Sequence, residues 1–451
     1  MSAGPRTPAE RVYAELLERV GEAHPRPRIE PVRRLAELAG SPQLSYPVIQ
    51  VAGTNGKTST SRAVESLLRA HGLRTGLFTS PHLVDFTERF QIGGAPIDGE
   101  VLASAWEELK LPLAVADAEL ESSGQGPITF FEALAVLAFA AFADAPVDAA
   151  VIEVGMGGEW DATNIVDARV AVFTPIGLDH TEQLGPDVQT IARTKAGIVK
   201  PGSTVVTAAQ EVDALAELED AAARHDAPIF VAGRDFRLLD DRVAVGGRQI
   251  RVAGLSGAAS EPAFVPLFGA HQAENVALAI AAAEAFFGAE RPLPGEVLDE
   301  GLGALTSPGR LQLIGADPVI YVDAAHNPHG ARALVRAVEE SFAFEELALV
   351  VGVLAEKDAA GLLAALAPIA HRVTVTPVDS PRSFGQSELR ALAEEEIPGT
   401  PVEVAQSLPE ALEEARAWAQ RAEGRAVLVV GSVLLAGEAI AHARSAGWGA
   451  A

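Results

Sequence analysis

The chain has 451 residues, of which 48% are hydrophobic and 21% charged, and its formal net charge at pH 7 is −26. Its length suits two or three domains, and its composition is that of a globular chain rather than a disordered one. The negative charge argues against binding duplex DNA or an anionic membrane, and the lack of cysteine excludes disulfides, thiolate metal sites and a cysteine nucleophile.

The N-terminal stretch contains no apolar signal core. The longest apolar run is ALAVLAFAAFA at 133–143, and its 11 residues are too few to cross a bilayer. We therefore expect a buried, alanine-rich helix at this position and a cytoplasmic protein.

The first motif in the chain is a strand, a glycine loop and a helix, in the sequence VIQVAGTNGKTSTSRAVESLLRA that begins at Val48. This order directs backbone N–H groups and a helix N-terminus at an anion. The common phosphate-loop spacing would place glycine at position 51, where this chain has Val51, so this is either a failed match or a different loop with the same function. The candidate phosphate-binding residues are Gly53, Gly56, Lys57 and either Thr58 or Ser59.

Polar residues stand where packing alone would not require them: Ser80 just past a strand, Glu153 among apolar neighbours and Asp179–His180 on a turn after a strand. Lys195 lies in an otherwise apolar helix. An unpaired carboxylate among the apolar neighbours of Glu153 would be costly, which suggests a ligand for it. Serine and glutamate oxygens suit Mg²⁺, whereas an imidazole is a less usual Mg²⁺ ligand. The alternative is structural, with Glu153 paired to a neighbouring base and His180 capping a helix.

Apolar, β-branched runs alternate with helical patterns through most of the chain, which indicates largely parallel sheets covered on both faces. A hairpin, DRVAVGGRQIRVAGL at 241–255, is expected to attach to the first sheet. The proline- and glycine-rich stretch at 291–313 is the predicted boundary. We place the domains at 1–305 and 306–451, both of α/β class, with ligands at the C-terminal ends of the strands.

Nine motifs in this order resemble the folylpolyglutamate synthase and dihydrofolate synthase family, within the Mur-type ligases. The resemblance extends from about residue 29 to the VLVVGSVLLAG strand near the end. The motifs are VAGTNGKTS, FTSPHL, TFFEALAVLAF, EVGMGGEWDATN, GLDHTEQLG, IARTKAGI, GAHQAEN, SPGRLQ and DAAHNPHGA.

The resemblance implies a fold and a reaction. The fold is an N-terminal P-loop ATPase-like domain of the Mur ligase central type, which binds ATP and pterin, plus a smaller Rossmann-like C-terminal glutamate-ligase domain. ATP phosphorylates a folate-type carboxylate, and L-glutamate attacks the acyl phosphate. The acceptor is dihydropteroate, the γ-glutamyl tail of tetrahydrofolate, or both, and the family suggests a monomer.

The resemblance also assigns roles to individual residues. Two Mg²⁺ ions are implied, one held by Ser80 and Glu153 and one by His180, with Lys195 as a carbamylated ligand. Lys57, Lys195 and His326 are the implied catalytic residues, with Asn327 near the reacting groups and Ser432 on the glutamate side. The implied nucleotide-binding residues are Asn55, Gly56, Lys57, Thr58, Asn275, Arg310 and Asp323. The implied pteroate contacts are Ile29, Glu30, Pro31, Val32, Thr129, Phe130, Phe131, Glu132, Trp160, Asp161 and Ala162.

Some positions depart from the family pattern. Glu159 stands where the family commonly has arginine, so a substrate carboxylate handled there would need another partner. The other departures are Thr58, Trp160, Ala324 and Gln312.

Three alternatives remain open at this stage. A cell-wall ligase of the Mur type would carry a nucleotide-sugar domain before the loop, yet 52 residues precede Gly53. An inactive relative would act as an ATP-binding module, and a plain P-loop kinase would leave the C-terminal motifs unexplained.

Overall fold

The computed structural model describes residues 7–21 and 26–448. The chain divides into two compact units. Unit 1 comprises Met1–Asp240, Ile250–Phe264 and Glu274–Leu305, and unit 2 comprises Asp241–Gln249, Val265–Ala273 and Thr306–Ala451.

Unit 1 is built around an eight-stranded sheet in the order β4-β3-β2-β5-β1-β6-β7-β8. Six strands, β2, β5, β1, β6, β7 and β8, run parallel, and the pairs β2–β3 and β3–β4 are antiparallel. The strands are β1 Val48–Ala52, β2 Thr75–Phe78, β3 Phe90–Ile92, β4 Ala95–Pro96, β5 Ala149–Glu153, β6 Val170–Phe173, β7 Thr204–Thr207 and β8 Ile229–Val231. The prediction of a mostly parallel sheet is confirmed, with the phosphate loop following its central strand β1.

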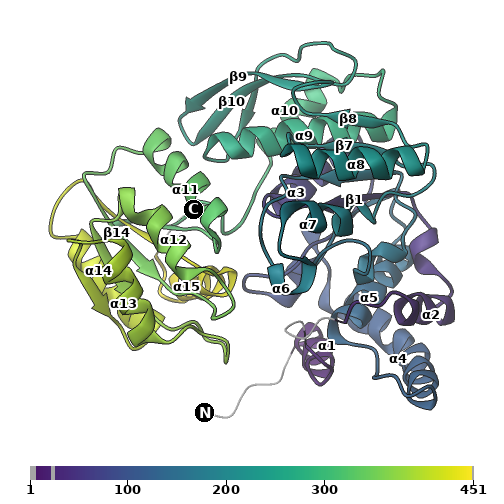
Figure 1. Ribbon diagram of the computed structural model, residues 1–451, viewed down its shortest axis with the longest axis horizontal. Helices are drawn as coiled ribbons and strands as arrows, with labels where there is room; N and C mark the ends of the chain where they lie inside the picture. The colour runs from purple at the N-terminus through teal and green to yellow at the C-terminus, as the bar shows by residue number, and fades with distance from the viewer. Residues whose placement is uncertain (1–6, 22–25, 449–451) are drawn as a thin grey trace. The chain divides into compact units, whose positions relative to one another are not determined.

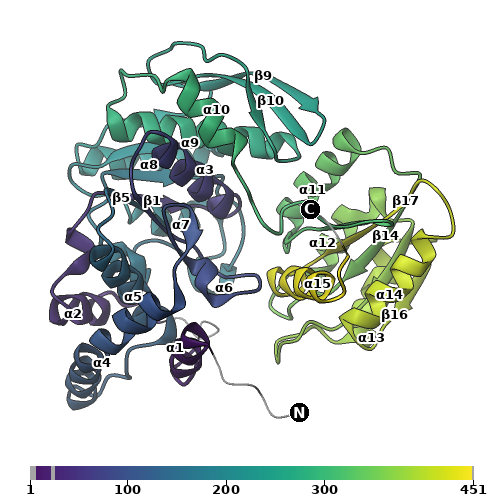
Figure 2. The same cartoon turned by 180° about the vertical axis from the view of Figure 1, so that it is seen from behind.

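Helices line the sheet of unit 1 on both sides, as Figures 1 and 2 show. They are α1 Pro8–Leu17, α2 Glu30–Leu38, α3 Lys57–Ala70, α4 Gly99–Ser122, α5 Phe130–Asp144, α6 Thr181–Leu184, α7 Val188–Ala196, α8 Val212–Arg224, α9 Ala270–Phe287 and α10 Gly295–Gly303. Helices α1, α2, α4 and α5 pack together over one apolar core (Figure 1). The predicted alanine-rich helix is α5, and it is buried along most of its length.

Local sequence explains where the key helices begin. Helix α5 starts with a capping box, in which the Thr129 hydroxyl accepts from the Glu132 backbone and the Glu132 carboxylate accepts from Thr129. Helix α7 begins at Val188 and is capped by Asp187, whose carboxylate accepts from the Thr190 backbone. Each cap fixes the first turn of a helix that carries predicted site residues.

Unit 2 contains a six-stranded sheet in the order β12-β13-β17-β14-β15-β16. Only β12 is antiparallel to its neighbour. Helices α11, α12 and α13 pack on one face, and α14 and α15 pack against strands of the same sheet (Figure 1). The strands are β12 Gln312–Ala316, β13 Val319–Val322, β14 Glu346–Val351, β15 Arg372–Val375, β16 Val402–Val404 and β17 Arg425–Val430, and the helices are α11 Pro328–Ser341, α12 Ala359–Leu366, α13 Gln386–Glu396, α14 Leu408–Ala419 and α15 Val433–Ser445.

The predicted hairpin forms β9 (Arg237–Ala244) and β10 (Gly247–Ala253), but it does not join the first sheet. It pairs with β11 (Ala263–Val265) in a separate three-stranded sheet, so that part of the prediction is wrong. The last strand of the large sheet is β8, which pairs only with β7 in that sheet. Among the described residues, no helix has the length and apolar character needed to cross a membrane.

Candidate active site

The phosphate loop turns sharply at two glycines. Gly53 has φ of +146°, and a Cβ there would lie 1.8 Å from the Thr174 hydroxyl oxygen of the neighbouring strand end. Gly56 has φ of +89°, and a Cβ there would lie 2.5 Å from Oδ1 of Asn275. Both positions therefore require glycine for conformation and for space. The loop delivers the chain directly into the N-terminus of α3, which begins at Lys57.

Two lysine ammonium groups converge on one carbonyl of this loop. Lys195 Nζ donates to the Gly53 carbonyl at 2.8 Å, and Lys57 Nζ donates to the same oxygen at 3.2 Å and to the Thr54 carbonyl at 3.3 Å. Together with the N-terminal end of α3, they form a concentration of positive charge suited to phosphate oxygens.

Lys195 lies on α7 and is buried. Burial, with the nearby charge of Lys57 as the second cause, lowers the pKa of Lys195 from its ordinary 10.5 to about 7. Asp179 and Asp161 act in the opposite direction. Burial therefore favours the neutral amine of Lys195 far more than water would.

Glu153 is the last residue of β5 and is 1% exposed. The Thr58 hydroxyl lies 2.9 Å from one carboxylate oxygen of Glu153 and 3.0 Å from the other. The structure therefore places the residue after the loop lysine against the predicted metal ligand. A hydroxyl and a carboxylate are oxygen donors of the kind that Mg²⁺ prefers, so this pair fits such an ion.

Ser80 and His180 follow other strands of the same sheet. Ser80 lies just after β2 and is partly exposed, and His180 precedes α6 with φ of +51°. The His180 side chain makes no cap to α6; its Nε2 lies 3.9 Å from Asp179 Oδ2, and its side chain is 41% exposed. The proposed helix-capping role is therefore wrong for its side chain. In the described part of the chain, no three or more His, Asp or Glu side chains form a metal-binding group, so the ligand set stays a prediction.

The segment after Glu153 is stabilised by hydrogen bonds to one of its own residues, Asp161. The Asp161 carboxylate accepts from the Met156 backbone at 2.9 Å and from the Thr163 backbone at 2.9 Å and hydroxyl at 2.5 Å, and burial raises its pKa. Ala162 is buried, whereas Trp160 is 37% exposed. Of the three pteroate contacts predicted here, Trp160 therefore offers the most surface.

This segment also packs on the helix that carries Lys195. The Glu159 backbone N–H donates to the Thr194 carbonyl at 2.8 Å. The Asn164 amide donates to the Glu159 carbonyl at 3.1 Å and to the Gly197 carbonyl at 3.0 Å. The loop following Glu153 and the end of α7 therefore form one connected structure.

The other predicted pteroate contacts differ in their exposure. Pro31 and Val32 are buried in unit 1, whereas Glu30 is exposed and Ile29 is partly exposed. In the second group, Thr129 and Phe130 are buried, and Phe131 is partly exposed. The Glu132 carboxylate is engaged by Arg28 and by its own helix cap.

In unit 2, the predicted residues cluster at the ends of β12–β13 and β17. The buried carboxylate of Asp323 accepts from the Leu311 backbone at 2.9 Å and the Ala325 backbone at 2.8 Å, and burial raises its pKa while the Arg310 charge opposes this. His326 Nδ1 lies 3.0 Å from the Ala324 carbonyl, which can only accept. Asn327 caps α11 and Ser432 caps α15 through their side-chain oxygens.

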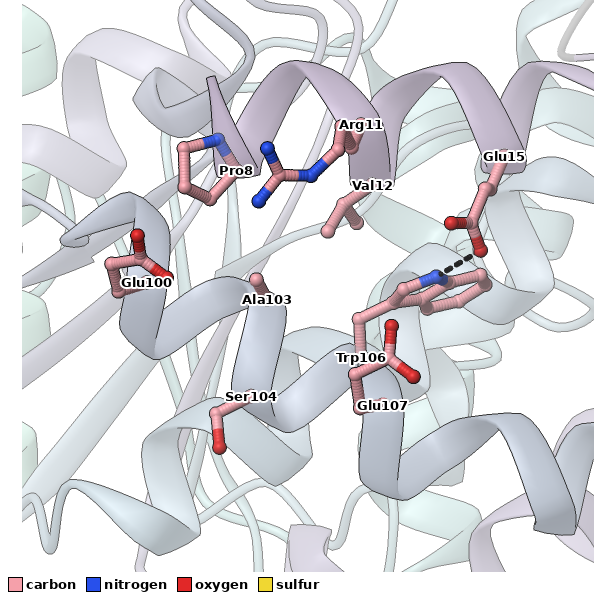
Figure 3. Close-up of a pocket in the computed structure, with 9 residues that line it drawn as sticks. All are labelled: Pro8, Arg11, Val12, Glu15, Glu100, Ala103, Ser104, Trp106 and Glu107. Carbon is pink, nitrogen blue, oxygen red and sulfur yellow. Dashed lines mark hydrogen bonds between the residues drawn. The ribbon is translucent and has the colours of Figure 1, made fainter. Parts of the chain in front are cut away.

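A separate hollow of about 330 Å³ lies between α1 and α4. Figure 3 shows Trp106 donating to Glu15 at its edge. None of the predicted site residues lines it. The lining residues are Pro8, Arg11, Val12, Glu15, Glu100, Ala103, Ser104, Trp106 and Glu107.

Sequence reasoning missed several contacts that shape the site. Thr54 exchanges hydrogen bonds with Gly177, at 3.0 and 3.1 Å, which joins the loop to the segment before His180. The contact of Lys195 with Gly53 spans 142 positions and had no local signal. A threonine directly after the loop lysine was the one available hint of the Thr58–Glu153 pair.

Comparisons with known proteins agree with this geometry. Residues 51–283 match the family model described as Mur ligase middle domain, and residues 309–433 match Mur ligase, glutamate ligase domain. A curated relative, the dihydrofolate synthase/folylpolyglutamate synthase of Mycobacterium tuberculosis, is 41% identical, with 92% of this chain and 90% of that protein covered.

Two solved structures also match nearly the whole chain. The Mycobacterium tuberculosis folylpolyglutamate synthase complexed with ADP has a TM-score of 0.91 and 39% identity, covering 97% of this chain and 98% of that chain. Escherichia coli FolC in complex with DHPP and ADP has a TM-score of 0.83 and 29% identity, covering 98% and 99%. With near full-length matches of this kind, the chain belongs to the folylpolyglutamate synthase/dihydrofolate synthase family of Mur-type ligases.

Proposed function

We propose that this ATP-dependent ligase joins L-glutamate to a folate-type carboxylate, both converting dihydropteroate to dihydrofolate and extending the γ-glutamyl tail of tetrahydrofolate. A carboxylate oxygen of the acceptor attacks the γ-phosphorus of ATP, which forms an acyl phosphate and releases ADP. The amine of L-glutamate then attacks the acyl carbon, loses a proton and expels phosphate, which leaves an amide.

The observation that carries this proposal is the convergence of Lys57 and Lys195 on the Gly53 carbonyl beside the N-terminus of α3. An anionic acceptor must approach an anionic γ-phosphate, and the charge of Lys57 together with the N-terminus of α3 reduces their repulsion there, while Lys195 reaches the same carbonyl as the amine to be carbamylated. The relatives named above, one complexed with ADP and one with DHPP and ADP, support a nucleotide and a small-molecule acceptor.

Mg²⁺ fits the oxygen donors of this unit. Glu153 would hold it, with Ser80 as a further ligand and His180 on the second ion, and Thr58 orients the Glu153 carboxylate. When bound, Mg²⁺ neutralises phosphate charge and polarises the transferring group. Asn55, Gly56 and the α3 N-terminus supply the backbone donors that orient the phosphates.

Carbamylation of Lys195 is supported by the same burial that lowers its pKa to about 7. The neutral amine adds to CO₂ with loss of a proton, which turns a cation into a carboxylate-like anion. We expect Lys195→Ala to abolish ligation, with partial restoration by added short carboxylates. Near-normal activity of that variant would contradict the carbamate role.

Unit 2 is proposed to supply the remaining nucleotide and glutamate contacts. Arg310 would face the phosphates, Asp323 the ribose, His326 the reacting groups and Ser432 the glutamate. In unit 1, Asn275 would face the adenine, and its amide lies against Gly56 of the phosphate loop. Residues 1–305 would thus bind ATP and pterin and residues 306–451 glutamate, in a protein that acts as a monomer.

The test is product analysis by mass after incubation with ATP, Mg²⁺ and L-glutamate, with dihydropteroate and tetrahydrofolate as separate acceptors. We expect one added glutamyl residue from dihydropteroate, at least one from tetrahydrofolate, and acceptor-dependent phosphate release. The control omits the acceptor, and a cell-wall UDP-linked acceptor serves as the negative. Phosphate release that no folate acceptor stimulates would overturn the proposal.

A further inference from the structure

Three consecutive carbonyls before α5 all accept hydrogen bonds from arginine side chains. Arg28 donates to the Gly126 carbonyl at 2.8 Å and to the Pro127 carbonyl at 2.7 Å. Arg19 donates to the Ile128 carbonyl at 2.8 Å. Because loop carbonyls ordinarily bond to water, two guanidinium groups on three successive carbonyls indicate that this stretch is held in one conformation.

Each arginine is also paired with a carboxylate that holds the same stretch. Arg28 forms a two-point ion pair with Glu132, both contacts at 2.8 Å, and the side chains are 17% and 6% exposed. A Glu132 oxygen also accepts from the Thr129 backbone at 2.7 Å. A planar guanidinium can serve the carboxylate and two carbonyls at once, which a lysine ammonium cannot do with the same geometry.

The stretch leads directly into residues that face the candidate active site. Phe131, in the first turn of α5, lies against Gly155, where a Cβ would be 2.4 Å from the Phe131 ring. Gly155 follows Glu153 by two positions. A shift of the first turn of α5 would therefore move an aromatic ring that packs on the loop after the predicted metal ligand.

We propose that Arg28 is a positioning residue for the acceptor substrate: it fixes 126–132 so that Phe131, which is partly exposed at the start of α5, presents a preformed surface to the pteroate group. The inference rests on the proposed function, because the acceptor identifies what this surface binds. Arg28 itself is occupied by Glu132 and two carbonyls, so its role is to hold the surface rather than to touch the reacting atoms.

The test compares Arg28→Lys with wild type in steady-state ligation. We expect KM for dihydropteroate to rise about ten-fold, because small displacements of a binding surface weaken binding strongly. KM for ATP and for L-glutamate should change less than about two-fold, since their predicted contacts lie elsewhere. The matched control is Arg34→Lys, which breaks a two-point pair with Glu119 of 2.8 and 2.9 Å on the exposed surface and should change no KM.

A second variant and a second measurement keep the inference testable if Arg28→Lys folds poorly. Glu132→Gln retains an acceptor for the Thr129 backbone but loses the charge that orients Arg28, and it should raise the same KM by a smaller factor. Hydrogen exchange of the peptide covering 124–132 should accelerate in both variants.

An unchanged KM for dihydropteroate in folded variants would overturn the inference, even if hydrogen exchange accelerates. Wild-type enzyme that ligates no glutamate to any folate acceptor would instead overturn the proposed function. The two failures are therefore separate.

Discussion

Replacing Lys195 by methionine should make the protein more stable while removing its activity. The pKa of Lys195 falls from 10.5 to about 7 on folding, which at 1.36 kcal/mol per pKa unit corresponds to a cost of about 5 kcal/mol for the charged form. The lost bond to the Gly53 carbonyl offsets about 2 kcal/mol of that cost, and Lys57 still donates to this oxygen. At pH 7 about half of the folded amine is neutral, which reduces this cost to about 4 kcal/mol, so we expect a net gain of about 2 kcal/mol and a rise of a few degrees in Tm.

The pH dependence gives the sharper test. Between about pH 7 and 10.5 the unfolded state binds the proton on Lys195 and the folded state does not, so wild-type stability rises with pH in that window. The advantage of Lys195→Met should thus be fully present below about pH 7 and decline by about 1.4 kcal/mol per pH unit above it. Differential scanning calorimetry in CO₂-free, metal-free buffer at pH 7.5 and 9.5 measures both quantities.

Lys200→Met is the matched control. Burial lowers the pKa of Lys200 to about 8, but Nζ donates to the Asn164 carbonyl at 2.6 Å and the Val166 carbonyl at 2.5 Å. Replacing Lys200 by methionine leaves these two carbonyls without the ammonium donor, and that cost cancels the benefit of removing a buried charge. We therefore expect no gain in Tm. A Lys195→Met variant that is less stable than wild type at pH 7, or that keeps the wild-type pH slope, would refute the reasoning.

The remaining predictions concern the phosphate loop. Gly53→Ala should abolish nucleotide binding and lower Tm, because the new Cβ would lie 1.8 Å from the Thr174 hydroxyl oxygen on a backbone with φ of +146°. Isothermal titration with ADP measures the binding, and calorimetry measures Tm. A normal affinity for ADP would contradict this prediction. Lys57→Ala should lower kcat at least about 100-fold by removing fixed charge at the transferring phosphate. Initial-rate kinetics measure that loss, and unchanged turnover would mean that phosphate transfer occurs elsewhere.

Much of the fold follows from local sequence patterns. The buried parallel strands β1, β5 and β17 are mostly apolar, and a glycine follows each of them within two residues, a pattern that is readable without knowledge of their neighbours. The short strands β3, β4 and β16 were missed, because they have two or three residues and are defined by pairing partners rather than by composition. The hairpin was found, but its partner β11 could not be, since three residues carry no periodic signal.

The candidate site was predictable to a similar degree. The order of strand, loop and helix and the polar residues at strand ends are visible in the sequence. They place Lys57, Glu153 and His180 on their elements without any knowledge of tertiary contacts. The hydrogen bond between Lys195 and Gly53 and the arginine hydrogen bonds to 126–128 connect residues far apart in the sequence. A single sequence does not indicate which distant residues lie close together in space. Packing supplied these contacts, so only the structure could report them.

The Lys57 ammonium on the Gly53 carbonyl has a consequence for the rate at which a nucleotide binds. At long range a polyanion meets a chain with net charge −26 and is repelled, whereas close to the loop it meets the Lys57 ammonium and the N-terminus of α3. Since the Debye length is about 8 Å at physiological ionic strength, salt screens the distant repulsion far more than the local attraction. Association of ATP should thus be slowest in the most dilute buffers, the reverse of the behaviour of enzymes that steer their substrates by overall charge.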